Sequence, residues 1–335
     1  MTAAGEKIAA AIRSSGPVQF SQFMETALYD AECGYYVSGR SVFGRAGDFY
    51  TSEQLQPVFG RLVAAALGRR RPEGDKAWRV VEWGAGRGEM EEHLSELGYA
   101  AIDVGRDDAP ESFEGVAFSN ELFDALPVDV AKRTDGVWRL MRVTEEGARF
   151  VWSPGEKLGG EWLEYAGRAG AFIEQDEVWI ELPVRAKGAL EQIGARLDRG
   201  SVVAIDYGYT EQELRRFAAG TLMSYRRHQA SGEVLENPGE QDITAHVPFT
   251  YLMESAVGLG WRDGRLRTLC RWAMEECSES GLERSIEAEN ELARVKLRLQ
   301  LKTILFGMGE SFRVAEWDKG EPKSNEPQLA PGLEG

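Results

Sequence analysis

A glycine-rich turn is the feature of this sequence whose residue types and spacing most directly suggest chemistry. Residues 82–88 read Glu-Trp-Gly-Ala-Gly-Arg-Gly and follow an apolar stretch. Glycines let the backbone approach a ligand closely, and the free N–H groups of a following helix would face that ligand. The GxGxG spacing after an acid is associated with S-adenosylmethionine, whereas a dinucleotide favours GxGxxG. We therefore expect cofactor contacts from Glu82, Gly84, Ala85, Gly86 and Gly88. The alternative is a glycine-rich turn that binds no ligand.

Two further groups of polar residues follow predicted strands. Asp103 ends the second strand, 21 residues after Glu82, where an acid can bond ribose hydroxyls, although a strand-end aspartate without a partner fits as well. Asn120, Glu121 and Asp124 directly follow a third apolar strand. The carboxyl ends of central strands are where open α/β sheets place their active sites. We therefore expect a functional site after the third strand, with ordinary loop chemistry as the alternative.

These residues require a sheet that brings strand ends together. Apolar segments predict strands at 78–82, 100–104, 115–119 and 201–206, and a helix at 88–97 whose Met90, Leu94 and Leu97 point inward. Strand, turn, helix and strand in this order open a doubly wound sheet. The fold class expected is α/β, a Rossmann-like class I methyltransferase sheet with helices on both faces, an N-terminal helical extension and an inserted α+β substrate region.

The remaining pattern divides the chain into regions. We expect an N-terminal helical and lid region at 1–74, a cofactor-binding domain at 75–317 with insertions at about 130–182 and 209–260, and a disordered tail at 318–335. The other predicted elements are helices at 4–13, 18–29, 58–67, 183–198 and 282–306, a hairpin at 137–152, and strands at 178–182 and 310–317. The last helix is amphipathic, with Leu282, Ile286, Leu292, Val295 and Leu299 on its apolar face.

Composition narrows the choice of partners. The net charge is −16, whereas a protein that binds a phosphate backbone normally carries a basic face, so we expect no nucleic acid partner. The basic run at 69–71 is interpreted as a solvated helix end. Three cysteines without CxxC spacing and three histidines predict neither a disulfide framework nor a metal site. The lack of a signal peptide or a long apolar run favours a cytoplasmic protein that does not enter a membrane.

Seven short stretches in one order resemble a known family. The chain is similar to the MidA-like methyltransferases, which include the mitochondrial complex I assembly factor that methylates an arginine of a core subunit. The stretches that carry the resemblance are METALYDAECGYY (24–36), FGRAGDFYTS (43–52), EWGAGRG (82–88), NELFDALP (120–127), IDYG (205–208), PGEQDITA (238–245) and MGESF (308–312).

The resemblance implies S-adenosylmethionine as cofactor and a lid over it from Gly47, Asp48 and Phe49, although these three residues could equally form a structural turn. The sequence also departs from the family. Only about ten residues separate Asp103 from the next strand, so the family's helix and strand there are missing and the adenosine pocket is expected to be remodelled. Pro248 stands where the family has an acid.

An arginine acceptor would need a carboxylate, because its guanidinium stays protonated and is held best by a bidentate pair. Glu121 is the first candidate for this catalytic role and Asp124 the second, while Asn120 could bond cofactor or substrate. His228, in a polar loop, could act as a general base or simply be solvated. Asp206 and Tyr207 end the central strand and are expected to border the substrate cleft.

Three classes of function remain open. The first is a protein arginine methyltransferase whose protein substrate has an accessible arginine. The second is a small-molecule O- or N-methyltransferase, and the third is a non-catalytic assembly protein that retains the fold. A homodimer is left open. The glycines and Glu121 argue against the third class, since a pure scaffold does not need them.

Overall fold

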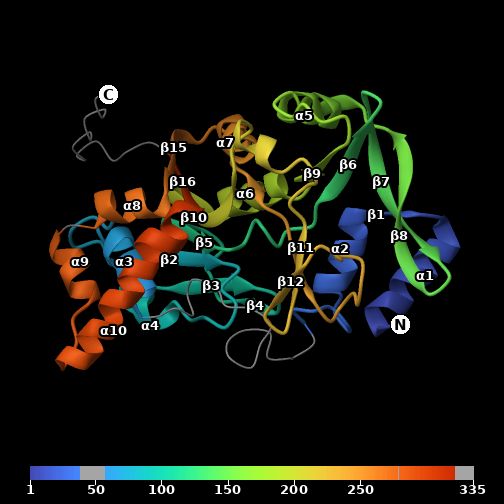
Figure 1. Cartoon of the computed structure of the whole chain (residues 1–335). Helices are drawn as coiled ribbons and strands as arrows, with labels where there is room; N and C mark the ends of the chain where they lie inside the picture. The colour runs from blue at the N-terminus through green and yellow to red at the C-terminus, as the bar shows by residue number, and fades with distance from the viewer. Residues whose placement is uncertain (38–56, 278, 321–335) are drawn as a thin grey trace.

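A mixed sheet forms the centre of the computed structural model, which describes residues 1–37, 57–277 and 279–320 (Figure 1). Its strands, in spatial order, are β15 (Arg262–Thr268), β16 (Phe312–Lys319), β10 (Leu197–Tyr209), β5 (Phe113–Asn120), β2 (Arg79–Trp83), β3 (Ala100–Asp103) and β4 (Arg106–Asp107). The four strands from β10 to β3 pair in parallel, while β16 and β4 join them antiparallel. The carboxyl ends of β2, β3, β5 and β10 therefore meet at one edge, as the sequence predicts.

Helices cover both faces of this sheet because its buried strands alternate between them. Val80, Val116 and Val203 pack on one face, and Val81, Ala117 and Ala204 on the other. The first face is covered by α3 (Val58–Gly68), α4 (Glu91–Leu94), α8 (Leu269–Glu276) and α10 (Glu291–Lys302), and the second by α6 (Ala186–Arg196) and α7 (Phe249–Gly258). The predicted doubly wound α/β class is confirmed.

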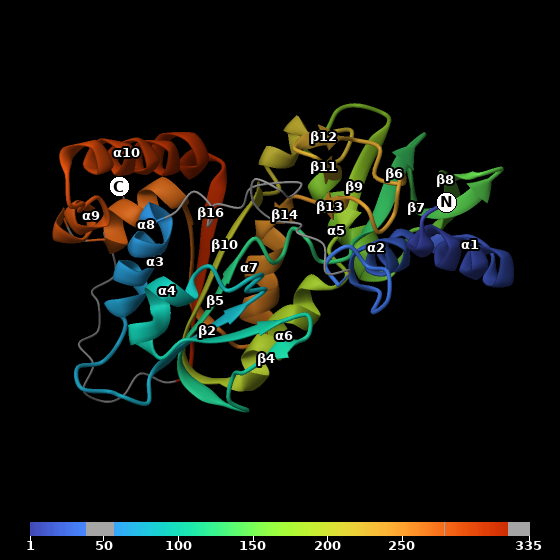
Figure 2. The same ribbon diagram turned by 90° about the horizontal axis from the view of Figure 1, so that it is seen from below.

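A second, antiparallel sheet lies beside the central one (Figures 1 and 2). Its strands are β1 (Val18–Gln19), β7 (Val137–Glu146), β6 (Asp129–Thr134), β9 (Val178–Leu182) and β8 (Arg149–Lys157). One face packs against α1 (Ala3–Ser15) and α2 (Phe20–Tyr29), and the other against α5 (Gly160–Gly170). The hairpin predicted at 137–152 is present as β7 and β8.

A small sheet follows β10 in the chain, and its residues line a cavity together with the end of β10. It consists of β11 (Met223–Arg226), β12 (Gln229–Ser231) and β13 (Asp242–Thr244), and β14 (Val247–Pro248) then pairs with the end of β10. These strands were not predicted from the sequence, because strands this short and polar carry little hydrophobic alternation.

The N-terminal region differs from the single unit expected at 1–74. Helices α1 and α2 pack on the antiparallel sheet, whereas α3 belongs to the core of the central sheet. The tail boundary predicted at 318 also differs, because β16 extends through Lys319. Its last two residues pair with β10, which is the reason they remain part of the strand.

The long helix predicted at 282–306 is wrong. The chain instead forms α9 (Glu279–Ser285), α10 and a π-helical turn at Thr303–Gly307. Asn290 begins α10 as its N-cap, accepting a hydrogen bond from the N–H of Ala293. The restart rotates the helix, so Leu292 and Leu299 are 83% and 61% exposed while Leu297 is buried.

The basic run at 69–71 follows the end of α3 as the sequence predicts, and Arg69 is exposed, but Arg70 is not a solvated side chain. Arg70 is mostly buried and pairs with Glu316 of β16, to which Trp272 Nε1 also donates at 3.1 Å. Arg69 Nη1 donates to a backbone carbonyl of α8 at 2.6 Å. Arg70 therefore ties the end of α3 to the sheet through a buried ion pair, and Arg69 ties it to α8 through an exposed hydrogen bond.

Candidate active site

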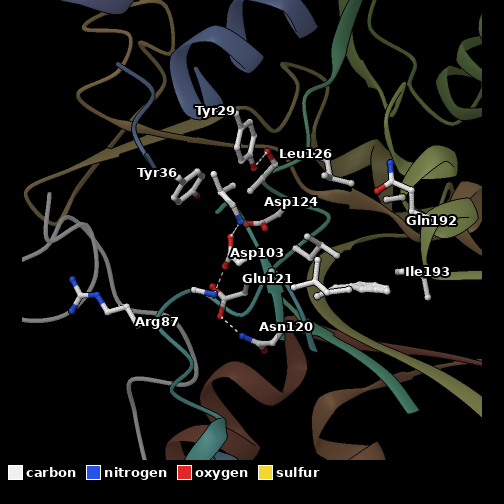
Figure 3. Close-up of a pocket in the computed structure, with 18 of the residues that line it drawn as sticks. Tyr29, Tyr36, Arg87, Asp103, Asn120, Glu121, Asp124, Leu126, Gln192 and Ile193 are labelled. Atoms are coloured by element: carbon white, nitrogen blue, oxygen red, sulfur yellow. Dashed lines mark hydrogen bonds between the residues drawn. The ribbon is translucent and has the colours of Figure 1, made fainter. Parts of the chain in front are cut away.

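A cavity of about 460 Å³ opens at the carboxyl ends of β2, β3 and β5. This volume lies in the range of small-molecule and cofactor sites. Figure 3 shows Asp103, Asn120, Glu121 and Asp124 around it. The sequence predicted these four residues as site residues, and the parallel strands bring them together because each follows a strand end.

The glycine turn lines this cavity through Gly84 and Gly86. Both have left-handed backbones, with φ of 72° and 56°, which L side chains rarely adopt. A Cβ on Gly84 would lie 3.0 Å from Leu122 Cδ1. The N–H of Gly86 donates to the Asp103 carboxylate, so the acid at the end of β3 also orders the turn. The glycines therefore keep the wall of the cavity as bare backbone.

Three other residues of the predicted turn do not reach the cavity lining. Glu82 is fully buried and accepts a hydrogen bond from the Tyr99 hydroxyl at 2.5 Å. Alternation along β2 directs Glu82 away from the face that carries Trp83, which does line the cavity. Ala85 is buried, and Gly88 lies against Arg106. Their predicted roles in cofactor binding therefore have no direct contact to support them.

The helix after the turn is also shorter than expected. Turns occupy Gly88 to Met90, α4 begins at Glu91 and lasts one turn, and a 3-10 turn follows at Ser95–Leu97. Met90 and Leu94 point inward as predicted.

The segment after Asp103 is as short as the sequence predicts. The chain turns back through β4 and enters β5 without a helix between Asp103 and Phe113. The side wall of the cavity comes instead from α6, through Ala189, Gln192 and Ile193 (Figure 3). Sequence reasoning predicted this helix but gave it no role, since only the tertiary fold places it beside β3.

Two tyrosines cover the cavity from the N-terminal side. Tyr29 of α2 donates to the carbonyl of Ala125 at 2.9 Å, and Tyr36 donates to Asp242 Oδ1 at 2.7 Å. Their rings contact each other at 5.5 Å between centroids. Both tyrosines and Asp242 belong to stretches that carry the family resemblance, and no other signal in the sequence marks them as site residues.

The acidic turn after β5 is held in a strained shape. Glu121 has a φ of 52°, which is uncommon for a residue with a side chain, and such outliers concentrate at functional sites. Asp206 at the end of β10 is fully buried and accepts the N–H groups of Phe123 and Asp124 at 2.9 and 3.3 Å. Asp206 therefore positions the turn that presents Glu121, although it does not line the cavity itself.

Burial makes this cluster of carboxyl groups reluctant to ionise. The pKa of Asp124 is raised well above its ordinary value by burial and then by the neighbouring charges of Asp206 and Glu121. Burial and then the neighbouring charge of Glu121 raise the pKa of Asp206 to about 8. Burial also raises the pKa of Asp103. A site of this kind favours positively charged ligands, which would restore the ionised forms.

A second cavity, of about 700 Å³, adjoins the first on the side of β10. Glu121, Asp124 and Asp242 line both, so the two cavities meet at three carboxylates. Aromatic rings surround the remainder, and they belong to Tyr207, Tyr209, Phe217, Tyr225 and Phe312. We call the first the cofactor cavity and the second the acceptor cavity. Tyr207 borders the acceptor cavity as the sequence predicted.

Other predicted site residues lie elsewhere. His228 is exposed at the turn between β11 and β12, outside the residues that line either cavity. Gly47, Asp48 and Phe49 fall outside the described residues. Among the described residues, no group of three His, Cys, Asp or Glu side chains could hold a metal ion, and no helix is long and apolar enough to cross a membrane.

The cofactor cavity fits S-adenosylmethionine. Its bare glycine backbone leaves room for the amino-acid end of the cofactor, Asp103 and Asn120 offer hydrogen-bond partners to hydroxyl groups, and Ile102 and Ile193 offer apolar walls to a base. S-adenosylmethionine supplies a methyl group bound to a positively charged sulfur. The acidic lining suits that charge.

Comparison with known proteins supports this assignment. Residues 105–263 match the family described as "Putative S-adenosyl-L-methionine-dependent methyltransferase". The chain is similar to the mitochondrial protein arginine methyltransferase NDUFAF7 of Danio rerio, at 25% identity over 74% of this chain and 71% of the relative. The human NDUFAF7 is 26% identical over 74% and 67% of the two chains.

A solved structure extends the likeness to three dimensions. A protein from Burkholderia thailandensis bound to S-adenosyl-homocysteine superposes with a TM-score of 0.81 and 28% identity, over 95% of this chain and 92% of the other. Fold, cofactor cavity and family match together define this chain as an S-adenosylmethionine-dependent methyltransferase. Within that class it is a relative of the NDUFAF7 arginine methyltransferases, which confirms the resemblance found in the sequence.

Proposed function

We propose that this methyltransferase acts on an arginine side chain of a protein, which the acceptor cavity binds as a cation. One observation carries the proposal: Asp124 is 4% exposed, lines both cavities, and its Oδ1 has no hydrogen-bond partner among the described residues, while the hydroxyl of Tyr207 interacts with the same carboxyl group. A buried carboxylate oxygen without a partner costs free energy, and a guanidinium N–H group would satisfy it. The proposal therefore gives this oxygen a partner that the fold itself does not supply.

The other carboxylates fit the same ligand. Glu121 and Asp242 flank Asp124 where the cavities meet, so a guanidinium held there would direct one nitrogen toward the cofactor cavity. Positioning of the two reactants is the main contribution that a protein makes to such a displacement. The rings of Tyr207, Tyr225 and Phe312 would pack on the guanidinium plane and stem. The relatives named protein arginine methyltransferases give independent support for this class of acceptor.

The test is transfer of labelled methyl groups from S-adenosylmethionine into a cell extract, followed by mass spectrometry of protein and small-molecule fractions. We expect label in protein, on arginine. Glu121→Gln and Asp124→Asn should each lower the transfer rate at least about 100-fold, because a charge-assisted contact to the acceptor is lost. Glu164→Gln, the same chemical change at an exposed position of α5, is the matched control and should retain the rate.

Label confined to small molecules would contradict the proposal and favour the second class, a small-molecule O- or N-methyltransferase. Full activity of both carboxylate variants would instead show that the acceptor binds elsewhere.

A cytoplasmic location and a homodimer are also part of the proposal. Fractionation of cells would test the location, and gel filtration would test the homodimer.

A further inference from the structure

A histidine that was not predicted as a site residue, His246, lies in the wall of the acceptor cavity. His246 connects β13 to β14, and contacts on both sides fix its backbone. Its N–H donates to Thr221 Oγ1 at 3.0 Å, and the preceding N–H of Ala245 donates to the carbonyl of Asp124 at 2.9 Å. The histidine is therefore carried by a segment that is bonded directly to the acidic turn.

Aromatic contacts orient the His246 ring. It lies edge to face against Tyr207 and Phe217, with centroids 5.2 and 5.0 Å apart. The side chain is half-buried, and its Nδ1 has no hydrogen-bond partner among the described residues. A ring that is held by packing keeps its nitrogens available for a proton.

The groups that face His246 come from several elements. Tyr207 of β10 adjoins it directly, and Asp124, the ion pair of Glu213 with Arg313, and Arg216 share the acceptor cavity. Glu181 of β9 lines a small hollow on its other side. Burial lowers the pKa of His246 below its ordinary value. The imidazole is therefore neutral near pH 7.

Methylation of a guanidinium requires a place for one proton. The reaction forms a bond from the methyl carbon to nitrogen and breaks the carbon–sulfur bond, whose electron pair stays on sulfur. Acceptor and product each carry one positive charge while the sulfonium becomes a neutral sulfide, so one N–H proton departs. A neutral imidazole beside the acceptor is suited to take it.

We propose that His246 accepts the proton released from the acceptor nitrogen during methyl transfer. This inference rests on the proposed function only in requiring an acceptor that loses a proton in the acceptor cavity. Asp124 binds the cation, and His246, on the segment bonded to the same turn, removes the proton that would otherwise remain beside the new methyl group.

Single-turnover methyl transfer across a range of pH tests the role in the reaction. The wild-type rate should rise with pH and level off above the His246 pKa, which lies below its ordinary value of 6.5. At the pH where the wild-type rate has levelled off, His246→Gln should be about 100-fold slower, and its rate should keep rising with pH because solvent takes the proton. A purely structural role would lower the rate equally at every pH. If His228→Gln lost activity while His246→Gln kept the wild-type rate, His246 would not be the proton acceptor.

Nuclear magnetic resonance of labelled histidine adds a readout without turnover. The chain has three histidines, and His93 and His228 lie outside the acceptor cavity and serve as internal references. Adding N-acetyl-arginine amide with S-adenosylhomocysteine should shift the His246 resonance and lower its titration midpoint, because a cation then lies beside it. No change at His246 with saturating probe would overturn the inference.

The outcomes separate this inference from the proposed function. Label found only in small molecules contradicts arginine as the acceptor, while the pH profile of that transfer still decides the role of His246. Label on protein arginine with an unchanged profile in His246→Gln contradicts the inference and leaves the proposed function standing. No transfer to either fraction contradicts both.

Discussion

At the scale of single residues, the site depends on a few positions with left-handed backbones. Gly84 keeps the wall of the cofactor cavity open, and Glu121 adopts a left-handed backbone that turns its carboxylate toward both cavities. The spacing of the glycines was visible in the sequence. The left-handed backbone of Glu121 was not, since no adjacent residue in the sequence signals it.

Gly84→Ala should weaken cofactor binding at least about tenfold. The new methyl group would meet Leu122 at 3.0 Å and would stand in a backbone with φ of 72°. Calorimetry with S-adenosylhomocysteine measures the loss. Gly74→Ala is the matched control, since Gly74 has φ of 75° and open space around it.

Both glycine variants should lose roughly 1 kcal/mol of unfolding free energy from the left-handed backbone alone. Only Gly84→Ala should lose affinity as well. Equal affinities for the two variants would mean that Gly84 has a role in the turn but none in the cofactor site.

At the scale of elements, the ends of β5 and β10 act as a pair. Asp206 of β10 accepts two N–H groups of the turn after β5, so a carboxyl group on one strand determines the shape of the neighbouring loop. The sequence placed Asp206 and the turn at adjacent strand ends, and the register of the parallel pair then brings them into contact.

Asp206 should make stability depend on pH. Its pKa is raised from 3.8 to about 8, so between these values the folded protein holds a proton that the unfolded chain has released. The unfolding free energy therefore falls as pH rises through this window, by at most about 1.4 kcal/mol per pH unit for one proton, and levels off above it. Asp124 contributes with the same sign.

Asp206→Asn should flatten this dependence, because an amide carries no charge while its oxygen can still accept from the turn. Urea unfolding at about pH 5.5, 6.5 and 7.5 compares the two proteins. Parallel curves for wild type and variant would assign the pH dependence to other groups.

Elements were easiest to predict where burial imposes a period. The predicted positions agree within a few residues for α3, α6 and the five strands β2, β3, β5, β10 and β16, which are apolar on the faces they bury. Strands β4 and β15 were not predicted, because β4 has only two residues and β15 has no buried residue. The interrupted helix at 282–306 was missed because its leucines continue a helical period across Asn290, although a new N-cap begins there. Local capping overrode the longer pattern.

At the scale of the whole molecule, charge and layout act together. The whole chain has a net charge of −16, and the acceptor cavity is itself lined by carboxylates. The protein therefore attracts cations over a distance. Helices α1 and α2 stand on the antiparallel sheet, yet Tyr29 at the end of α2 reaches the cofactor cavity. The two sheets therefore contribute to one site.

The apparent KM for an arginine-bearing protein acceptor should rise several-fold between about 0.05 M and about 0.3 M salt, because screening shortens the reach of surface charge to within about 10 Å. The kcat should change little, since bound charges in the cavity are screened less. Steady-state kinetics at constant pH measure both. A KM that stays constant or falls with salt would contradict attraction by the acidic surface.

The sequence by itself determined the class of fold, the cofactor turn, and Asn120, Glu121 and Asp124 as candidates, because short-range spacing and strand ends encode these features. Only the tertiary structure decided that Glu82 points into the core, that α6 replaces the missing side wall, and that Asp242 and His246 join the acidic turn. Asp242 and His246 lie more than a hundred positions from Glu121, α6 lies in a separate segment between them, and Glu82 lies on the opposite face of β2 from the cavity. Their meeting depends on sheet register and packing, which no local pattern of residues records.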